Sequence, residues 1–294
     1  MKHKHLFMRY PEGREKALTF SFDDGVEQDL WFAALLRANG MKGTFNVNAG
    51  LIPEKPVDRN DPALNAFQKI QRRMTVSQLK TLFSGNYMEC ATHGYTHAQL
   101  EALDHPSMLW ELMIDRMQLE ALTGIPVVGH AYPMGTFSED AAKGLAEAGL
   151  QYGRTTRATH SFTQPKNWLL LDPTAHYADR EMPDLVGKFL SQRPEQTVNS
   201  PAADPWLFYI WGHTYEFEAY ATWHYVEELI KKLAGRRDVW YCTNIEARRY
   251  TAAFDGLQFS LDRSTVYNPS ALDVWGCCDG GTVVHIPAGK ITTL

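Results

Sequence analysis

Cysteine is scarce in this chain, whose 294 residues contain only Cys90, Cys242, Cys277 and Cys278. Four cysteines at such uneven spacing are too few for a disulfide-rich secreted scaffold. The adjacent pair, Cys277 and Cys278, also matches the ligand spacing of a zinc finger poorly. We therefore expect reduced thiols and a location in the cytoplasm.

Long apolar runs and clusters of positive charge are lacking as well. No stretch reaches the roughly 18 uninterrupted apolar residues of a membrane span. Residues 1–10 begin basic, but they lack the apolar core and the small-residue cleavage site of a secretory leader. The 34 acidic residues outnumber the 29 basic ones, and no dense group of Lys and Arg offsets the net charge of -5. These absences argue against a membrane or a nucleic acid as a partner.

What remains is the composition of a folded protein with a substantial core. Hydrophobic residues make up 44% of the chain and charged residues 21%, close to the averages for soluble globular proteins. The chain is longer than a typical domain, yet α/β barrels routinely reach about 250 residues as one unit. We expect one large domain at residues 1–250 and a small β-rich appendage at residues 251–294, packed on it.

Apolar patterns alternate between strands and helices along the large domain. A strand at residues 17–22, a helix at 28–39 and a strand at 43–47 form a βαβ start, which implies a parallel sheet. Further strands are predicted at residues 87–91, 127–132, 152–156, 169–171, 206–211 and 239–243, and further helices at 75–83, 106–122, 139–148, 185–190 and 219–233. Seven or eight such units, with candidate site residues after the strands, predict an α/β fold of the irregular (β/α)7-8 TIM-like barrel type.

Two regions depart from this alternation. Residues 53–73 are rich in Pro, Asp, Asn and Arg and show no strand period, so we interpret them as an insertion over one rim that could shape a cleft. Beyond residue 250, strand-like stretches at 257–261, 272–275 and 282–286 lie between Gly, Pro and Asn turns.

Two aspartates and two histidines form the strongest chemical signal. Asp23 and Asp24 stand before a glycine at the end of the first strand, and His93 and His97 follow the strand at residues 87–91. One carboxylate can hold a cation while its neighbour handles protons. Histidines four apart can bring both imidazoles to one ion. Neighbouring strand residues point to opposite faces, so the two aspartates can converge only if the strand has ended.

His213 is a candidate general acid because it comes just after the apolar strand at residues 206–211. A departing amine needs a proton, and histidine suits the pH range. A structural histidine at the rim is the alternative. Trp211 and Tyr215 flank it, and their rings could face a sugar or simply belong to the core. His176 follows a short candidate strand and could also line the cleft.

These motifs resemble those of the polysaccharide deacetylase family, carbohydrate esterase family four, whose shared region is the nodulation-protein-B homology domain. The resemblance covers roughly residues 17–245. Residues 21–25 match its first motif, Thr/Ser-Phe-Asp-Asp-Gly, and residues 93–97 match its second, His-Ser/Thr-x-x-His, except for Gly94.

The resemblance implies a role for each of these groups. Asp23 would be the general base and His213 the general acid, while a backbone amide near Met134 would help to hold the oxyanion. The implied ligands of a divalent metal, usually zinc, are Asp24, His93 and His97. Such a metal would activate the attacking water.

Two family motifs differ here. The third normally reads Arg-Pro-Pro-Tyr/Phe-Gly, but residues 131–135 read Ala-Tyr-Pro-Met-Gly and lack the arginine that orients the base. Arg154 or Arg157 could supply a guanidinium from the following strand, and the sequence does not choose between them. The fourth motif, an Asp and Trp arrangement, is not recognisable.

We therefore expect a metal-dependent hydrolase that removes acetyl groups from N-acetylated amino sugars or oligosaccharides. The candidate substrate-binding residues are Met134, Arg154, Trp211 and Tyr215. Two alternatives stay open: a hydrolase of a non-sugar C–N bond, such as a cyclic ureide or formamide, and a catalytically silent carbohydrate-binding member. Self-association is also left open.

Overall fold

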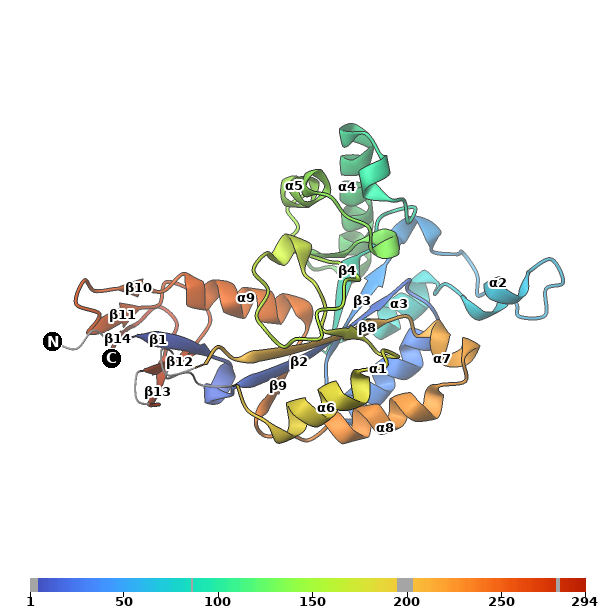
Figure 1. Cartoon of the computed structure of the whole chain (residues 1–294). Helices are drawn as coiled ribbons and strands as arrows, with labels where there is room; N and C mark the ends of the chain where they lie inside the picture. Colours follow the sequence, from blue (N-terminus) through green and yellow to red (C-terminus); the bar gives the residue numbers. More distant parts are fainter. Residues whose placement is uncertain (1–4, 86, 195–202, 279–280) are drawn as a thin grey trace.

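A parallel sheet forms the centre of the computed structural model, which describes residues 5–85, 87–194, 203–278 and 281–294 (Figure 1). The strands lie in the order β6-β5-β4-β3-β2-β8-β7, with β9 paired to β2, and their pairings are parallel. Their bounds are β2 (Lys16–Asp23), β3 (Gly43–Val47), β4 (Met88–Thr92), β5 (Gly129–Ala131), β6 (Tyr152–Arg154), β7 (Ala175–His176), β8 (Trp206–Gly212) and β9 (Val239–Tyr241).

The sheet curls towards a barrel through the segment that contains β7. Leu171 donates its N–H to the carbonyl of Gly153 on β6 (2.8 Å), and Thr174 donates to the carbonyl of Tyr209 on β8 (2.9 Å). Residues 171–176 therefore hydrogen-bond to β6 at their start and to β8 at their end. This curled parallel sheet confirms the predicted α/β fold of the irregular TIM-like barrel type.

The strand predicted at residues 169–171 is wrong for its first two residues, whereas Leu171 forms a parallel bridge with Arg154 of β6. Trp168–Leu170 is a 3-10 turn, with the Asn167 side chain accepting the Leu169 N–H (3.0 Å), and the strand comes later, as β7. Leu169 and Leu170 pack against the cluster between helices α4 (His105–Thr123) and α5 (Glu139–Glu147). Their apolar character therefore reflects burial beneath helices and not strand pairing. The other short 3-10 turns are Pro11–Gly13, Ala49–Leu51, Leu100–Ala102 and Pro133–Gly135.

Strand β2 is buried on both faces. Its successive side chains point alternately to the outer core and to the interior of the barrel, where the site lies. Phe20 and Phe22 pack against Phe32 of helix α1. Side chains on the opposite face of β2 form hydrogen bonds inside the barrel. For example, Thr19 Oγ1 donates to Asn244 Oδ1 (2.7 Å). Asp23 lies on this same interior face, because side chains two apart in a strand share a face.

Helices cover the outside of the sheet, α1, α6 and α8 on one side and α4 and α5 on the other (Figure 1). Several begin at side-chain caps; Asp104, for example, accepts the Ser107 N–H (2.9 Å) at the start of α4. The bounds are α1 (Gln28–Ala38), α3 (Val76–Leu82), α4 (His105–Thr123), α5 (Glu139–Glu147), α6 (Met182–Ser191) and α8 (Trp223–Leu233). Within the described residues, no helix has the length and apolarity needed to cross a membrane.

The helix predicted at residues 219–233 is present but begins only at Trp223, as α8 (Trp223–Leu233). A separate short helix that was not predicted, α7 (Tyr215–Ala219), begins just after the strand β8 and His213. Ala221 has a φ of 53°, which a right-handed helix does not accommodate. The break turns the chain and leaves α7 beside the site.

The C-terminal region is β-rich, and β1 (Leu6–Arg9), which was not predicted, pairs with its strand β12 (Val274–Cys278). Both termini lie at this end of the molecule (Figure 1). The other strands are β10 (Gln258–Phe259), β11 (Thr265–Tyr267), β13 (Val283–Ile286) and β14 (Ile291–Thr293). Helix α9 (Asn244–Asp255) runs across the expected boundary at residue 250, and the division into two domains stays a prediction.

Candidate active site

The two aspartates separate because β2 ends between them. Asp23 is its last residue, and Asp24 has a φ of 84°, followed by Gly25 at 60°. Two consecutive left-handed residues turn the chain out of the strand. Asp24 can therefore face the same side as Asp23, as the sequence argument required.

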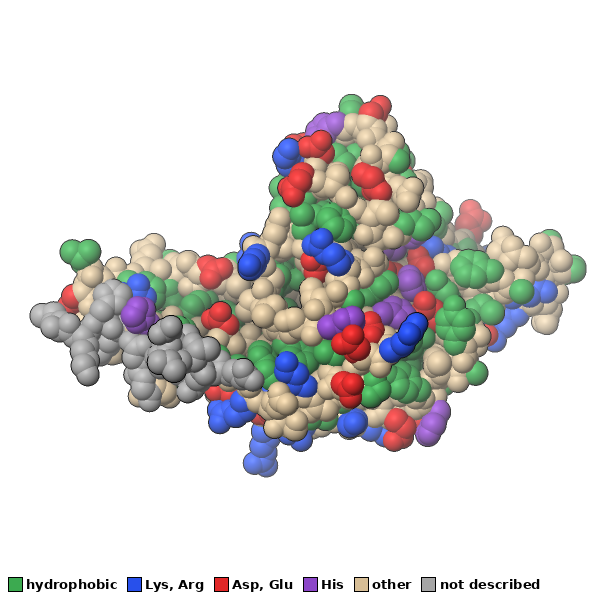
Figure 2. Space-filling view, in the orientation of Figure 1, with side chains coloured by type: hydrophobic (Ala, Val, Ile, Leu, Met, Phe, Trp, Pro, Cys, Tyr) green, Lys and Arg blue, Asp and Glu red, His purple; other side chains and the backbone are tan. Residues whose placement is uncertain are grey.

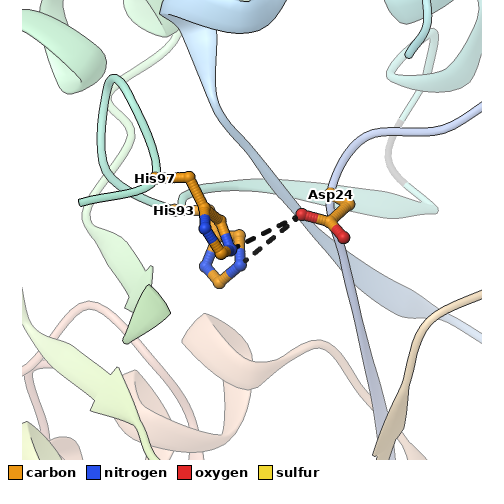
Figure 3. A group of neighbouring side chains, drawn as sticks. All are labelled: Asp24, His93 and His97. Atoms are coloured by element: carbon orange, nitrogen blue, oxygen red, sulfur yellow. Dashed lines mark ion pairs between the residues drawn. The ribbon is translucent and has the colours of Figure 1, made fainter. Parts of the chain in front are cut away.

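The two histidines come from the turn after β4. His93 Nδ1 lies 2.8 Å from the carbonyl oxygen of Ala131, so Nδ1 carries the hydrogen and Nε2 keeps a free lone pair. Asp24 Oδ1 lies 3.9 Å from Nε2 of His93 and 3.7 Å from Nε2 of His97. Figure 3 shows both imidazoles turned towards this carboxylate. The ligand atoms of the three residues all lie within 4.8 Å of one another.

The chemistry of this group fits a divalent cation. Asp24 Oδ1 is buried and has no hydrogen-bond partner among the described residues. Burial lowers the pKa of His93 to about 4, although the negative charges of Asp23 and Asp24 act to raise it. Burial also lowers the pKa of His97. Both imidazoles are thus neutral near pH 7, as metal ligation requires. One carboxylate and two imidazoles leave positions open, as in catalytic zinc sites.

Asp23 is held by groups on neighbouring strands and is only 2% exposed. Arg154 donates a hydrogen bond from Nη2 to Asp23 Oδ1, and Asn46 donates from Nδ2 to the same oxygen (2.8 Å). Burial alone would raise the pKa of Asp23, but the charge and the hydrogen bond of Arg154, together with the charge of protonated His213, hold it well below its usual range. Asp23 is therefore ionised with a fixed orientation.

The structure distinguishes the two arginines that the sequence could not. Arg154 is the last residue of β6 and points into the barrel, where its guanidinium also lies 4.8 Å from the ring of Trp211. Arg157 lies beyond the strand and pairs with Asp172 (2.5 Å) on the surface. Arg154 thus supplies the guanidinium that the third motif lacks.

His213 lies on the other side of Asp23, with 3.8 Å between its Nε2 and Asp23 Oδ2. Its Nδ1 lies 3.2 Å from Glu216 Oε1, and the second oxygen of Glu216 lies 3.0 Å from Nε2 of His176. Burial alone would lower the pKa of His213, but the hydrogen bond to Glu216 and the charges of Asp23 and Asp24 raise it. Burial would raise the pKa of Glu216, yet its two histidine partners lower it to about 2.

A second close group of possible metal ligands consists of His176, His213 and Glu216. Nδ1 of His176 accepts the Ala178 N–H (3.3 Å), so Nε2 carries the hydrogen in the neutral ring. That nitrogen lies 3.0 Å from Glu216 Oε2, an oxygen without another partner among the described residues. The group is better described as a carboxylate shared by two imidazoles than as a ligand set.

Met134 lies in the turn Pro133–Gly135, where it has a φ of 59°. This turn packs against the histidine turn: a Cβ on Gly94 would lie 3.2 Å from Cγ of Pro133, and Gly94 has a φ of 73°. A larger residue at 94 would be strained there, which explains the departure from the second motif. The oxyanion role of a backbone amide near Met134 stays a prediction.

Aromatic rings line the approach to His213. The ring of Tyr215 lies 5.1 Å from that of His213 and packs edge-to-face on Phe67 of helix α2 (Ala66–Ile70), at 5.8 Å. Phe67 is 55% exposed. Trp211 packs edge-on against His176 (4.8 Å). Histidine and acidic side chains gather on this face of the molecule, between the lobe of α4 and α5 and the helices α6 and α8 (Figure 2).

Sequence reasoning missed three contacts of this site. Glu216 could have been found, since it follows His213 by three positions, the spacing of one helical turn. Gln71 and Arg73 carried no such signal. Nε2 of Gln71 donates to Asp24 Oδ2 (2.8 Å), and Nη2 of Arg73 lies 3.0 Å from Asp24 Oδ1. The insertion at residues 53–73 thus reaches the site itself.

Comparison with known proteins identifies a family and a similar fold. The family model for polysaccharide deacetylase matches residues 10–153. A predicted polysaccharide deacetylase from Mycobacterium smegmatis has a similar structure, with 15% identity, a TM-score of 0.56 and coverage of 85% of this chain and 95% of that chain. At this identity the similarity shows the fold alone.

Two further solved structures match less of the fold. A polysaccharide deacetylase from Bacillus cereus has 19% identity and a TM-score of 0.40, and the match covers 52% of this chain but only 44% of that chain. A family-four carbohydrate esterase pseudoenzyme from Bacillus anthracis has 16% identity and a TM-score of 0.46, with coverage of 82% and 68%. No curated protein matches the chain significantly.

Proposed function

This chain belongs to the polysaccharide deacetylase family, and on that premise we propose that it is a metal-dependent hydrolase removing acetyl groups from N-acetylated amino sugars or oligosaccharides. One observation carries the proposal. Asp23 Oδ2 lies 3.8 Å from His213 Nε2 and 3.9 Å from His93 Nε2. A base, an acid and a metal-ligand group thus surround one small volume, as hydrolysis of an amide requires.

Asp24, His93 and His97 would hold the metal, which we propose to be zinc. A bound cation of this kind polarises the amide carbonyl and lowers the pKa of water from about 15.7 to about 7.

Asp23 would accept a proton from the attacking water. Its carboxylate is ionised, and Arg154 and Asn46 fix Oδ1, so Oδ2 is the oxygen left to face the water. A base positioned in this way contributes about 10²- to 10⁴-fold to the rate. Fixing the base also removes the entropy cost of orienting it during the reaction.

His213 would return a proton to the departing nitrogen. The Nδ1–H of His213 donates to Glu216, so Nε2 is the atom that faces the reacting group. The raised pKa of His213 keeps this nitrogen protonated at a higher pH than in a free histidine, and a protonated amine is the better leaving group. Glu216 and His176 hold the ring in this orientation.

The choice of an acetylated sugar rests on the family and on two structural features. Arg154 provides Asp23 with a guanidinium partner, so the absence of the third-motif arginine no longer favours a non-sugar C–N bond. The rings of Tyr215 and Phe67 beside His213 offer apolar faces of the kind that pack on sugar rings. A silent binding protein would not need a paired base and acid around open ligands.

The test is acetate release from a panel of N-acetylated mono- and oligosaccharides, with chelator-treated protein compared with protein to which zinc has been restored. Zinc-dependent release supports the proposal and ranks the substrates. No release from zinc-loaded, folded protein contradicts it; the same samples are then assayed with cyclic ureides and formamides.

The cytoplasm is the proposed location. The thiols of Cys90, Cys242 and Cys277 are free and buried, as expected where thiols stay reduced. Fractionation of the source cells with activity measured in each fraction tests it, and activity confined to the secreted fraction would contradict it.

A further inference from the structure

Arg73 places a second positive charge directly against the candidate metal ligands. It is the last residue of the insertion and precedes α3, and its side chain is 17% exposed. Its Nη2 lies 3.0 Å from Asp24 Oδ1, the same oxygen that both histidines face. Its Nη1 donates to the backbone carbonyl of Asp24 and to Asn48 Oδ1 (2.7 Å).

The guanidinium is fixed by its other contacts. Nδ2 of Asn48 donates to the carbonyls of His93 (2.5 Å) and Gly94 (2.7 Å). Arg73 is therefore linked through Asn48 to the histidine turn as well as to the aspartate turn. Because these acceptors belong to the backbone and to a buried amide, Arg73 cannot leave Asp24 without breaking several hydrogen bonds.

The charges of the site balance without a cation. Asp23 and Asp24 contribute two negative charges, and Arg154 and Arg73 contribute two positive ones. Asp24 Oδ1 has no hydrogen bond of good geometry within the described residues, although Nη2 is near. Arg73 thus acts on this oxygen mainly through its charge and leaves the lone pairs towards the imidazoles available.

We propose that Arg73 is a resident counter-ion of Asp24, which weakens the affinity of the site for a divalent cation and stabilises the cation-free protein. The inference rests on the proposed ligands Asp24, His93 and His97. Two positive charges that approach one carboxylate in a partly buried place repel each other, and this repulsion is only weakly screened by solvent. In the cation-free protein, Arg73 compensates a buried carboxylate that would otherwise be costly.

The experiment measures zinc affinity by competition with a chromophoric chelator, in the wild type, Arg73→Gln and Arg73→Lys. We expect Arg73→Gln to bind zinc about tenfold tighter or more, because a positive charge close to the cation is lost. Arg73→Lys, which keeps the charge, should stay within about threefold of the wild type. The matched control is Arg59→Gln: Arg59 belongs to the same insertion and pairs with Glu218 at 3.5 Å, and its loss should leave zinc affinity unchanged.

Thermal unfolding gives a second measurement that does not depend on activity. Cation-free Arg73→Gln should melt below the cation-free wild type, and zinc should raise its melting temperature by more than it raises that of the wild type. Equal or weaker zinc binding by folded Arg73→Gln overturns the counter-ion role and leaves the proposed function standing. Zinc binding that His93→Ala leaves intact overturns the ligand set, and with it both proposals.

Discussion

Arg154 on β6 donates a hydrogen bond to the carboxylate of Asp23 on β2, a residue 131 positions away in the chain. Three strands, β5, β4 and β3, lie between these two in the sheet, so the contact crosses the interior of the curled sheet. We propose that Arg154 orients the base Asp23, the role that the family assigns to an arginine of its third motif.

Replacement of Arg154 by lysine should lower kcat by about 10²-fold, because a base displaced by about 1 Å loses that much rate. Lysine retains the charge and so limits the cost of leaving Asp23 buried without a counter-ion. Steady-state kinetics on the best substrate of the acetate-release panel measure the effect, and circular dichroism checks the fold.

Arg157→Lys is the matched control for this variant. Its guanidinium is exposed and pairs with Asp172, so kcat should change less than twofold. Equal losses in the two variants would contradict a specific role of Arg154, as would a folded Arg154→Lys protein of wild-type activity.

Variants of the proposed metal ligands and variants of the proposed base should differ in their content of bound zinc. Asp24→Asn and His93→Ala should lose bound zinc, because each removes one of three protein ligands. Asp23→Asn should keep zinc and lose turnover, since an amide cannot accept the proton of water. Elemental analysis of the purified variants, after dialysis against zinc-free buffer, measures the first effect.

His105→Ala controls for the general loss of a histidine. His105 lies on the surface of α4, where it pairs with Glu147 at 3.0 Å, and its removal should leave the zinc content unchanged. If Asp24→Asn and His93→Ala both retain one zinc per chain, the ligand assignment is wrong.

The alkaline limb of the pH–rate profile should reflect the loss of the proton from His213. As a general acid it must be protonated, so activity is present below its pKa and is lost as the pH rises through it. The hydrogen bond to Glu216 and the charges of Asp23 and Asp24 raise that pKa above 6.5, against the effect of burial. Glu216→Gln removes the charge of the hydrogen-bonding partner and should move the alkaline limb down by about one pH unit, which corresponds to about 1.4 kcal/mol.

His176→Asn should move the same limb by less and in the opposite direction, because loss of the imidazole at the far oxygen of Glu216 leaves more of the carboxylate's negative charge to stabilise protonated His213. Glu228→Gln, which alters an exposed pair with Lys231 on α8, should not move it. A limb that stays in place in folded Glu216→Gln would show that the carboxylate does not control the acid.

The barrel and the meeting of the two motifs could be predicted because both follow from local pattern. Parallel strands present their carboxyl ends at one edge, so Asp23 at the end of β2 and His93 after β4 must lie close. Arg154 was one of two arginines that the sequence offered as a partner for Asp23. It is the last residue of β6, and Tyr152, two positions earlier on the same face of the strand, also points inwards, to Glu89 (2.7 Å). Arg157 follows the strand, where alternation no longer decides direction.

The remaining contacts of the site depend on tertiary structure, which the strand and helix periodicity of the sequence does not predict. Glu216 lies in a five-residue helix that is too short to give an apolar repeat, and the predicted helix began after it. Gln71 and Arg73 end an insertion without strand or helix pattern, and only its fold brings them to Asp24. The roles of all these residues stay predictions until they are measured.

The aromatic pair beside His213 should contribute to substrate binding and not to the chemical step. Tyr215→Ala and Phe67→Ala each remove one ring of an edge-to-face pair at the mouth of the site. Stacking of this kind contributes about 0.5–1.5 kcal/mol, so KM for an oligosaccharide should rise by roughly three- to tenfold with kcat nearly constant, the pattern for lost uniform binding. Tyr220→Ala is the matched control, because Tyr220 caps the same helix and is 71% exposed. A fall in kcat at unchanged KM in Tyr215→Ala would instead assign this ring to the support of His213, whose imidazole lies 5.1 Å away.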